Sequence, residues 1–224
     1  MNKIILGIDL GGCMSGNSAY ALARYDGSDL KVLEHFKEPK HTNHLECEDY
    51  LLKLLSKLKP DIICIDAPLS LPQALVEPSF QAKDREGKGE ILNPYLFRHT
   101  DYFLYKEFGL KPMPPAGDRI GRLTARCISF LHKLHYNGES INIDGKDVLI
   151  YEVYPKQIAQ HLNLLPYKKT PQRTLSALGF ETSVEDEHII DALLCVYAGK
   201  KILQGNYIDA DKETKQEGWC YPII

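Results

Sequence analysis

The sequence predicts an α/β protein built on a mixed five-stranded sheet, in which an antiparallel three-strand meander is followed by parallel strands. Three observations predict this class. Short apolar runs bounded by glycine or proline alternate with stretches of helical spacing. An Asp-Gly pair between the second and third runs favours a hairpin. A helical stretch then separates the third run from the fourth, as in a crossover between parallel strands.

The N-terminal part of the chain is expected to form four strands and one helix. The helix, Glu46–Leu58, places leucines at helical spacing and ends before Pro60. The last of the four strands is apolar up to a terminal aspartate. The expected strands are Lys3–Asp9, Ser18–Tyr25, Leu30–Phe36 and Asp61–Asp66.

The pattern loosens between residues 67 and 146, where prolines and a mixed-charge stretch interrupt the apolar runs. We expect a single domain over 1–224, with about 67–146 as an insertion that closes over the sheet. One helix in this region, at about 118–136, has a clear apolar stripe. The fifth strand, Asp147–Val153, follows the insertion.

Three helices are expected after the fifth strand. Pro155 can fill the first position of one, and Thr170–Leu178 is a second. The last helix is strongly apolar and ends near Gly205. Its start resembles a capping box in one of two frames, Ser183 with Asp186 or Thr182 with Glu185.

The composition indicates an ordinary globular protein. The formal net charge of −3 gives no indication of nucleic-acid binding, although a basic patch can exist locally. The six cysteines form no CxxC pair, so we expect reduced thiols, with Cys13 the one beside a candidate site. No signal peptide or membrane-spanning run is present, which predicts a cytoplasmic protein. The sequence does not fix the oligomeric state, and a homodimer is compatible with it.

Two aspartates close two of the expected core strands. Asp9 ends the first strand and Asp66 ends the fourth. Ligands of α/β sheets bind beyond the carboxyl ends of the strands, so neighbouring strands would bring both carboxylates within reach of one metal ion. Glu152, at the end of the fifth strand, is a fourth acid if that strand lies nearby.

The third aspartate, Asp191, lies near the start of the apolar last helix, where a carboxylate is costly unless it is paired or bound to a cation. At about 100° per residue, His188 lies about 60° and Glu187 about 40° from Asp191 around the helix. Asp186 lies about 140° away and favours the positive helix N-terminus instead. We therefore expect His188 and Asp191 to act together, with Glu187 as the alternative.

Three carboxylates from separate segments suit a pair of Mg²⁺ or Mn²⁺ ions, because these hard cations take oxygen ligands. Two such ions about 3.5–4 Å apart can activate water and stabilise the leaving oxygen of a phosphodiester. The 118–136 helix adds a basic stripe that can track a phosphate backbone or form a plain solvated face. The stripe consists of Arg119, Arg122, Arg126 and Lys133.

Six short motifs resemble, in order, domain-of-unknown-function family 429, which groups predicted nucleases of the ribonuclease H-like superfamily. They are GID, IDAPLSLP, RHTDYFLYKEFG, EVYPKQI, the YKK…R run and HIIDALLCVYAG, and they extend over nearly the whole chain. The HxxDA of the last helix also looks like that of Holliday-junction resolvases. The resemblance implies a ribonuclease H-like fold, with metal ligands at Asp9, Asp66 and Asp191 and with His188 as a ligand or proton-transfer group.

Four further motif residues are candidate substrate contacts on the resemblance alone: Arg98, Asp101, Lys168 and Arg173. A simple i,i+3 ion pair is the alternative interpretation of the first two.

The stretch GIDLGG also occurs in actin-like sugar kinases as a phosphate-binding turn. Such a kinase needs two similar lobes and a second glycine-rich loop, which this chain of 224 residues lacks. Gly7, Gly11 and Gly12 are instead expected to let the backbone turn beside a metal site. The sequence therefore predicts a metal-dependent phosphodiesterase or nuclease acting on nucleic acid or nucleotides. The alternatives are a non-catalytic nucleic-acid-binding relative, and a phosphotransferase or hydrolase of a small phosphorylated metabolite.

Overall fold

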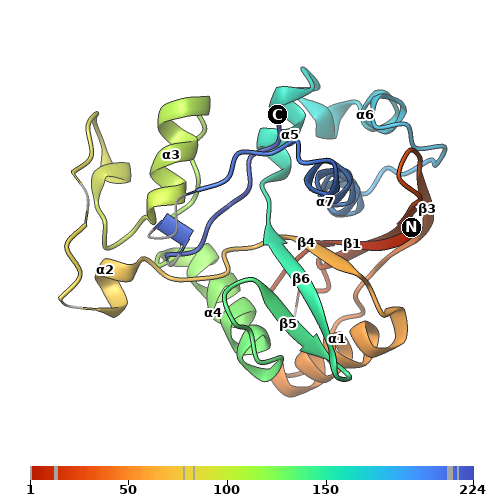
Figure 1. The fold of residues 1–224 in the computed structure, drawn as a ribbon, viewed down its shortest axis with the longest axis horizontal. Helices are drawn as coiled ribbons and strands as arrows, with labels where there is room; N and C mark the ends of the chain where they lie inside the picture. Colours follow the sequence, from red (N-terminus) through yellow and green to blue (C-terminus); the bar gives the residue numbers. More distant parts are fainter. Residues whose placement is uncertain (1, 13–14, 78, 83, 211–213, 216) are drawn as a thin grey trace.

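The computed structural model describes residues 2–12, 15–77, 79–82, 84–210, 214–215 and 217–224, so that Cys13 lies outside the described residues. A six-stranded sheet crosses the middle of the molecule in the order β3-β2-β1-β4-β6-β5 (Figure 1). Helices cover both of its faces, and a region of short helices and loops extends from one side.

Three strands form the antiparallel half of the sheet. β1 (Lys3–Asp9) pairs with β2 (Ala19–Tyr25), and β2 pairs with β3 (Leu30–Lys37). Asp26 shapes the turn after β2, because its carboxylate accepts hydrogen bonds from the backbone nitrogens of Ser28 and Asp29. These strands make the expected meander.

The other half of the sheet is mostly parallel. β4 (Ile62–Asp66) lies between β1 and β6 (Lys146–Glu152) and runs parallel to both. β5 (Ser140–Ile143) is an antiparallel edge strand on β6. The sequence predicts five strands, and β5 is a sixth that was not predicted. With four residues, two of them polar, it is too short and too polar to be recognised as an apolar run.

This mixed sheet with flanking helices confirms the predicted α/β class and the predicted antiparallel meander followed by parallel strands. The central strands β1 and β4 are buried on both faces, as their nearly continuous apolar sequences require.

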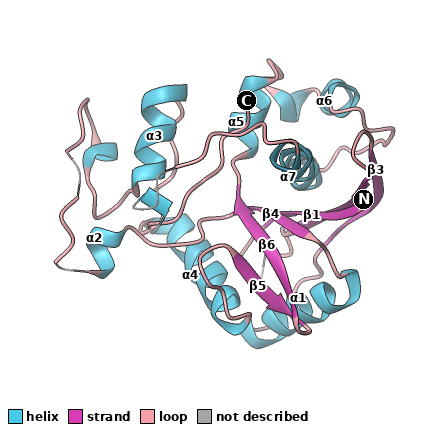
Figure 2. Ribbon diagram, in the orientation of Figure 1, coloured by secondary structure: helices cyan, strands magenta, loops and turns pink. Residues whose placement is uncertain are grey.

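Two layers of helices enclose the sheet, as the colouring of Figure 2 shows. On one face, Ile5 and Cys64 share a core cluster with apolar residues of the last helix. On the other face, Leu6 and Ile63 pack with residues of the helices that follow β3 and precede β5. The first layer contains α5 (Pro155–His161), α6 (Pro171–Ala177) and α7 (Glu187–Leu203), and the second contains α1 (His44–Leu58) and α4 (Asp118–Lys133).

The last helix, α7, packs directly across β1, β2 and β4. Gly7 of β1 permits this approach, because a Cβ at that position would lie 2.1 Å from the carbonyl oxygen of Ala192. Gly7 thus serves close strand–helix packing and not the turn that the sequence suggested. Gly199 plays the same role from the helix, since a Cβ there would lie 2.5 Å from Ile5 Cγ2.

Asp186 is the N-cap of α7, and its carboxylate accepts hydrogen bonds from the backbone nitrogens of His188 and Ile189. Both predicted capping frames were therefore wrong, because Ser183 and Thr182 lie three and four residues before the observed cap. Gly205 follows the helix with φ of 76°, in agreement with its predicted role as the stop.

Residues 67–146 do not pack as one unit. α2 (Gln73–Val76), η1 (Glu90–Leu92) and α3 (His99–Phe108) form the region that extends from the sheet (Figure 1). α4 and β5, in contrast, belong to the sheet and its core, since Cys127 and Phe130 of α4 are buried against sheet residues. Within the described residues, no helix combines the length and apolar character needed to cross a membrane.

Candidate metal centre

The parallel pairing of β1 and β4 brings two aspartates to the same sheet edge. Asp9 and Asp66 are direct partners in the β1–β4 register, and each is the last residue of its strand. Both side chains line a cavity of about 280 Å³ beyond the carboxyl ends of these strands. This edge is where α/β sheets bind ligands.

The third aspartate reaches the same cavity from α7. Asp191 is 4% exposed and lies one helical turn after His188, which also lines the cavity. The packing of α7 on β1 and β4 fixes this position. The structure therefore brings together all three aspartates and the histidine that the sequence singled out.

The negative charge of Asp66 has few stabilising partners. Among the residues that the structure describes, none donates a hydrogen bond to its carboxylate. Burial raises the pKa of Asp66 well above its usual value, and the neighbouring charges of Asp9 and Asp191 raise it further. A half-buried carboxylate without protein donors, beside two others, is costly unless a cation joins them.

His188 contacts the first aspartate directly. Its Nδ1 lies 2.7 Å from Asp9 Oδ2, so a carboxylate orients the ring. The hydrogen bond to Asp9 raises the pKa of His188, although partial burial opposes the shift. Carboxylates commonly orient histidines in this way at metal and acid–base sites.

Both oxygens of Asp191 have partners from the segment between α5 and α6. The hydroxyl of Tyr167 donates to Oδ1 at 2.6 Å, and Lys168 Nζ lies 2.6 Å from Oδ2. Burial raises the pKa of Asp191 to about 6, and these two contacts only partly offset that effect. Tyr167 was not among the predicted site residues, but its position in the YKK…R run was the available signal.

The three aspartates are spread more widely than the ligands of one ion. A single ion needs ligand atoms that lie close together. Within the described part of the chain, Glu38, His41 and Cys47 are the three possible ligands whose atoms all lie within 4.8 Å of one another, and the three aspartates do not meet this limit. Two ions about 3.5–4 Å apart suit a wider set of carboxylates better than a single ion does.

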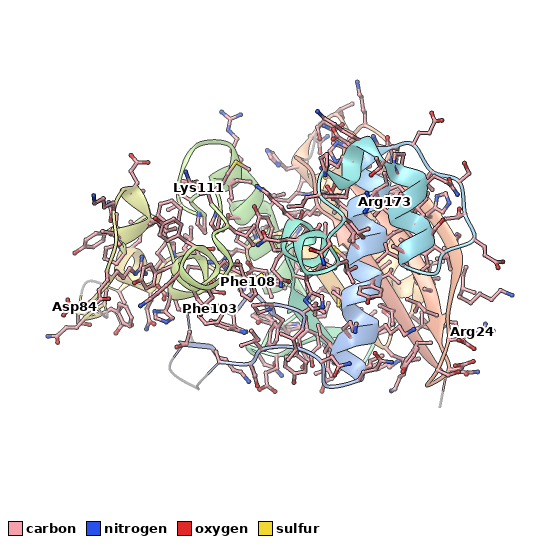
Figure 3. All side chains as sticks on the ribbon, turned by 90° about the horizontal axis from the view of Figure 1, so that it is seen from above. Arg24, Asp84, Phe103, Phe108, Lys111 and Arg173 are labelled. Atoms are coloured by element: carbon pink, nitrogen blue, oxygen red, sulfur yellow. The ribbon has the colours of Figure 1, made fainter. Side chains whose placement is uncertain are left out.

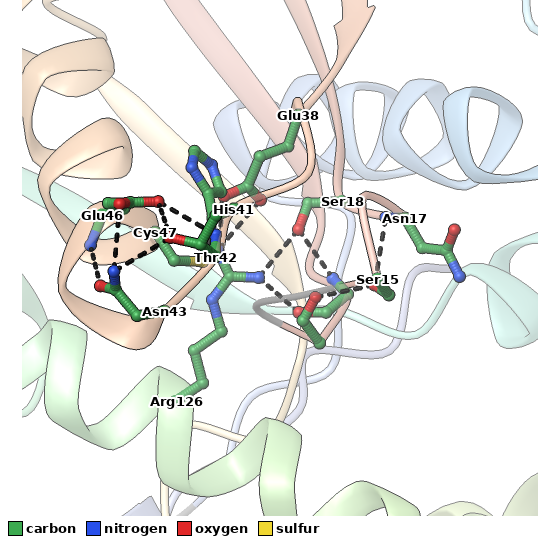
Figure 4. A network of polar contacts seen from close by, with 12 residues as sticks. Ser15, Asn17, Ser18, Glu38, His41, Thr42, Asn43, Glu46, Cys47 and Arg126 are labelled. Atoms are coloured by element: carbon green, nitrogen blue, oxygen red, sulfur yellow. Dashed lines mark hydrogen bonds and ion pairs between the residues drawn. The ribbon is translucent and has the colours of Figure 1, made fainter.

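The Glu38 group has a cation of its own. Arg126 Nη2 donates to both oxygens of Glu38, at 2.9 and 3.0 Å (Figure 4). The pair is almost completely buried. Arg126 Nη1 also donates to the Gly11 carbonyl oxygen and to Ser18 Oγ. The guanidinium neutralises Glu38 and fixes the turn that follows Asp9. Arg126 therefore fits neither alternative given for the basic stripe, because it is buried and paired with Glu38 instead of contacting phosphate or facing solvent.

Glu152 is also engaged by an arginine. Its two oxygens accept hydrogen bonds from Arg98 Nη2 and Nη1 at 2.6 and 2.7 Å, and the backbone nitrogen of Leu69 donates to the same carboxylate. Arg98 further bonds both oxygens of Asp101 and is 1% exposed. Glu152 is therefore not a free fourth acid, and Arg98 and Asp101 form the i,i+3 ion pair that was the alternative interpretation. All three residues still line the cavity, so a role in substrate binding stays a prediction.

A family model described as "Protein of unknown function (DUF429)" matches residues 7–214. The chain belongs to this family. No curated protein matches it.

Two solved structures resemble this DUF429 member. One is "T. thermophilus RuvC in complex with Holliday junction substrate", with 13% identity and a TM-score of 0.45, covering 91% of this chain and 96% of that one. The other is the fowlpox virus Holliday junction resolvase, with 15% identity and a TM-score of 0.39, covering 89% and 99%.

The remaining basic candidates of the DUF429 chain lie apart from the centre. Arg173 is exposed on α6 (Figure 3), and Arg122 is exposed on α4. Neither lines the cavity, whereas Lys168 does. The side chain of Arg119 lies outside the described part of the structure.

Proposed function

We propose that this protein is a divalent-metal-dependent phosphodiesterase that acts on nucleic acid or nucleotides. One observation carries the proposal: Asp66, paired in register with Asp9 and facing the same cavity as Asp191, is a half-buried carboxylate to which no described residue donates a hydrogen bond. Hydrogen-bond donors would be expected there if the group were merely structural.

Asp9, Asp66 and Asp191 are the residues that would hold Mg²⁺ or Mn²⁺. Carboxylate oxygens are the donors that these ions prefer, and the cavity beside them leaves room for water and substrate. When bound, a pair of such ions lowers the pKa of a water and stabilises the leaving oxygen of a phosphodiester.

The other residues of the centre have supporting roles. His188 is oriented by Asp9 and can carry a proton to or from a group in the cavity, or bind an ion through nitrogen. Lys168 supplies positive charge at the cavity edge, where a substrate phosphate would approach.

Mn²⁺ titration of the wild type, Asp9→Asn and Asp66→Asn tests the metal centre. We expect each substitution to weaken binding at least tenfold. Glu34→Gln, which removes an exposed acid of β3, is the matched control and should bind like the wild type. Equal affinity in all four proteins contradicts the proposal.

Hydrolysis assays with Mg²⁺ or Mn²⁺ test the activity. Single-stranded, duplex and four-way-junction nucleic acids and free nucleotides should be offered in parallel, with Asp9→Asn as the inactive control. A protein that binds these nucleic acids but cleaves none of them would be a non-catalytic relative.

A small phosphorylated metabolite is the second candidate substrate. Apolar side chains, including Leu104, Met113 and Leu123, form much of the cavity wall and can enclose a compact molecule. Cleavage of nucleotides or phosphate esters without cleavage of polymers would favour this class.

A further inference from the structure

A lysine forms an ion pair with one carboxylate oxygen of the candidate metal centre. Lys168 Nζ lies 2.6 Å from Asp191 Oδ2, while Asp191 is 4% exposed. The lysine itself belongs to a short segment, η2 (Tyr167–Lys169), and its side chain is 38% exposed. A buried carboxylate therefore has a cationic partner that reaches it from the surface.

The two partners of Asp191 differ in what they permit. Tyr167 is a neutral donor to Oδ1, and a carboxylate can keep such a bond while its other oxygen binds an ion. The ammonium of Lys168 is different, because a divalent cation on Oδ2 would lie within a few ångströms of it. At that distance like charges repel strongly in a partly buried site.

A second acid lies within reach of the same ammonium. Glu187 Oε2 is 3.6 Å from Lys168 Nζ, and the Glu187 side chain is 58% exposed. A lysine has a flexible stem, so the ammonium can move from Asp191 to Glu187 without a change in the backbone. The exposed carboxylate can thus receive the ammonium when Asp191 releases it.

We infer that Lys168 is a tethered cation that holds Asp191 in the metal-free protein and exchanges with a divalent metal ion, with Glu187 as the acceptor for the displaced ammonium. This inference rests on the proposed metal centre. It assigns Lys168 a role in regulating metal occupancy: binding of the ion must overcome an internal competitor, so the resting protein is kept metal-poor at low metal concentration.

The test is calorimetric titration of Mn²⁺ into the wild type, Lys168→Met and Lys169→Met. Lys169 is the neighbouring exposed lysine, so its replacement removes the same charge without touching Asp191. We expect Lys168→Met to bind Mn²⁺ about tenfold more tightly than the wild type, equivalent to about 1.4 kcal/mol. Lys169→Met should stay within about twofold of it. Circular dichroism checks folding, and Lys168→Gln serves if the methionine variant does not fold.

Glu187→Gln provides an independent readout. Loss of the acceptor should weaken Mn²⁺ binding in the wild-type background but leave the affinity unchanged in the Lys168→Met background, where no ammonium has to be received.

Two failures can be told apart with Asp9→Asn included. If Mn²⁺ binding depends on Asp9 but Lys168→Met binds no more tightly than Lys169→Met, only the exchange is overturned. If the wild type binds no Mn²⁺, or binds it as well as Asp9→Asn does, the metal centre itself is overturned.

Discussion

Asp9 and Asp66 are paired residues of two parallel strands, so the same backbone hydrogen bonds that align β1 with β4 also set their carboxylates side by side. A shift of one residue in this register would turn one of the two side chains to the opposite face of the sheet. The acid pair is therefore a property of the sheet itself, whereas Asp191 depends on how α7 packs.

Removal of the half-buried charge at Asp66 should stabilise the metal-free protein. Asp66→Asn relieves repulsion from Asp9 and Asp191 and leaves a neutral group in their place. We expect the free energy of unfolding at pH 7.5 with EDTA to rise by about 1–3 kcal/mol, a trade of stability for function. Urea unfolding measures it, and Glu34→Gln should change it by less than about 0.5 kcal/mol. A destabilised Asp66→Asn protein would contradict this.

Asp191 should make metal-free stability depend on pH. Its pKa is raised to about 6 in the folded protein, against about 3.9 for an unfolded aspartate. The folded state therefore binds more protons between these values, and stability falls as pH rises from about 4 to about 6. The loss should amount to about 2–3 kcal/mol relative to Asp191→Asn, in which this titration is absent. Urea unfolding in EDTA across this range measures the difference; parallel pH curves would refute it.

Arg98 should be essential for stability. Arg98→Met leaves the buried acids Glu152 and Asp101 without their cation. Breaking a buried ion pair from one side costs about 3–5 kcal/mol. Arg122→Met, on the exposed face of α4, should cost no more than about 0.5 kcal/mol. A small effect of Arg98→Met in urea unfolding would mean that water reaches these acids.

Gly7→Ala should damage both the fold and the metal centre. The new Cβ meets the Ala192 carbonyl and pushes β1 away from α7, which carries Asp191. We expect a loss of about 1–3 kcal/mol in unfolding free energy and weaker Mn²⁺ binding. Leu51→Ala destabilises the core beneath the other sheet face, so it serves as the control that should retain Mn²⁺ affinity. Equal Mn²⁺ affinity in Gly7→Ala and the wild type would show that metal binding does not depend on the close packing of β1 against α7.

His188→Ala should lower turnover by about 10²–10⁴-fold if the imidazole transfers a proton. Circular dichroism should show an intact fold, because Asp186 still caps α7. If His188 is an ion ligand instead, excess Mn²⁺ should partly restore activity. Wild-type turnover with unchanged Mn²⁺ affinity would leave the histidine without a chemical role.

Much of the fold follows from local sequence. The apolar runs ending in Asp9 and Asp66, the crossover helix and the apolar face carrying Asp191 all have short-range signatures. β5 could not be predicted in this way, because four residues that alternate polar and apolar become a strand only when β6 offers a partner. The cap of α7 was misplaced because several polar residues in succession can each serve as an N-cap.

Apart from the i,i+3 pair of Arg98 with Asp101, the roles of the basic and acidic residues outside the aspartate trio could not be predicted from the sequence. Arginines such as Arg98 and Arg126 often bind substrate. Here Arg98 forms an ion pair with Glu152, 54 positions away in the chain, and Arg126 forms one with Glu38, 88 positions away. Which charges meet inside a protein is decided by long-range packing. Spacing along a helix indicates only the face on which a side chain begins.

The packing of α7 on β1 has a consequence for the order of biosynthesis. Asp9 and Asp66 are synthesised before Asp191, and β1 and β4 can pair as soon as both strands have emerged from the ribosome. Asp191 follows later, on the helix whose close packing Gly7 permits. During synthesis the chain therefore holds an incomplete acid cluster until α7 has emerged and packed against β1.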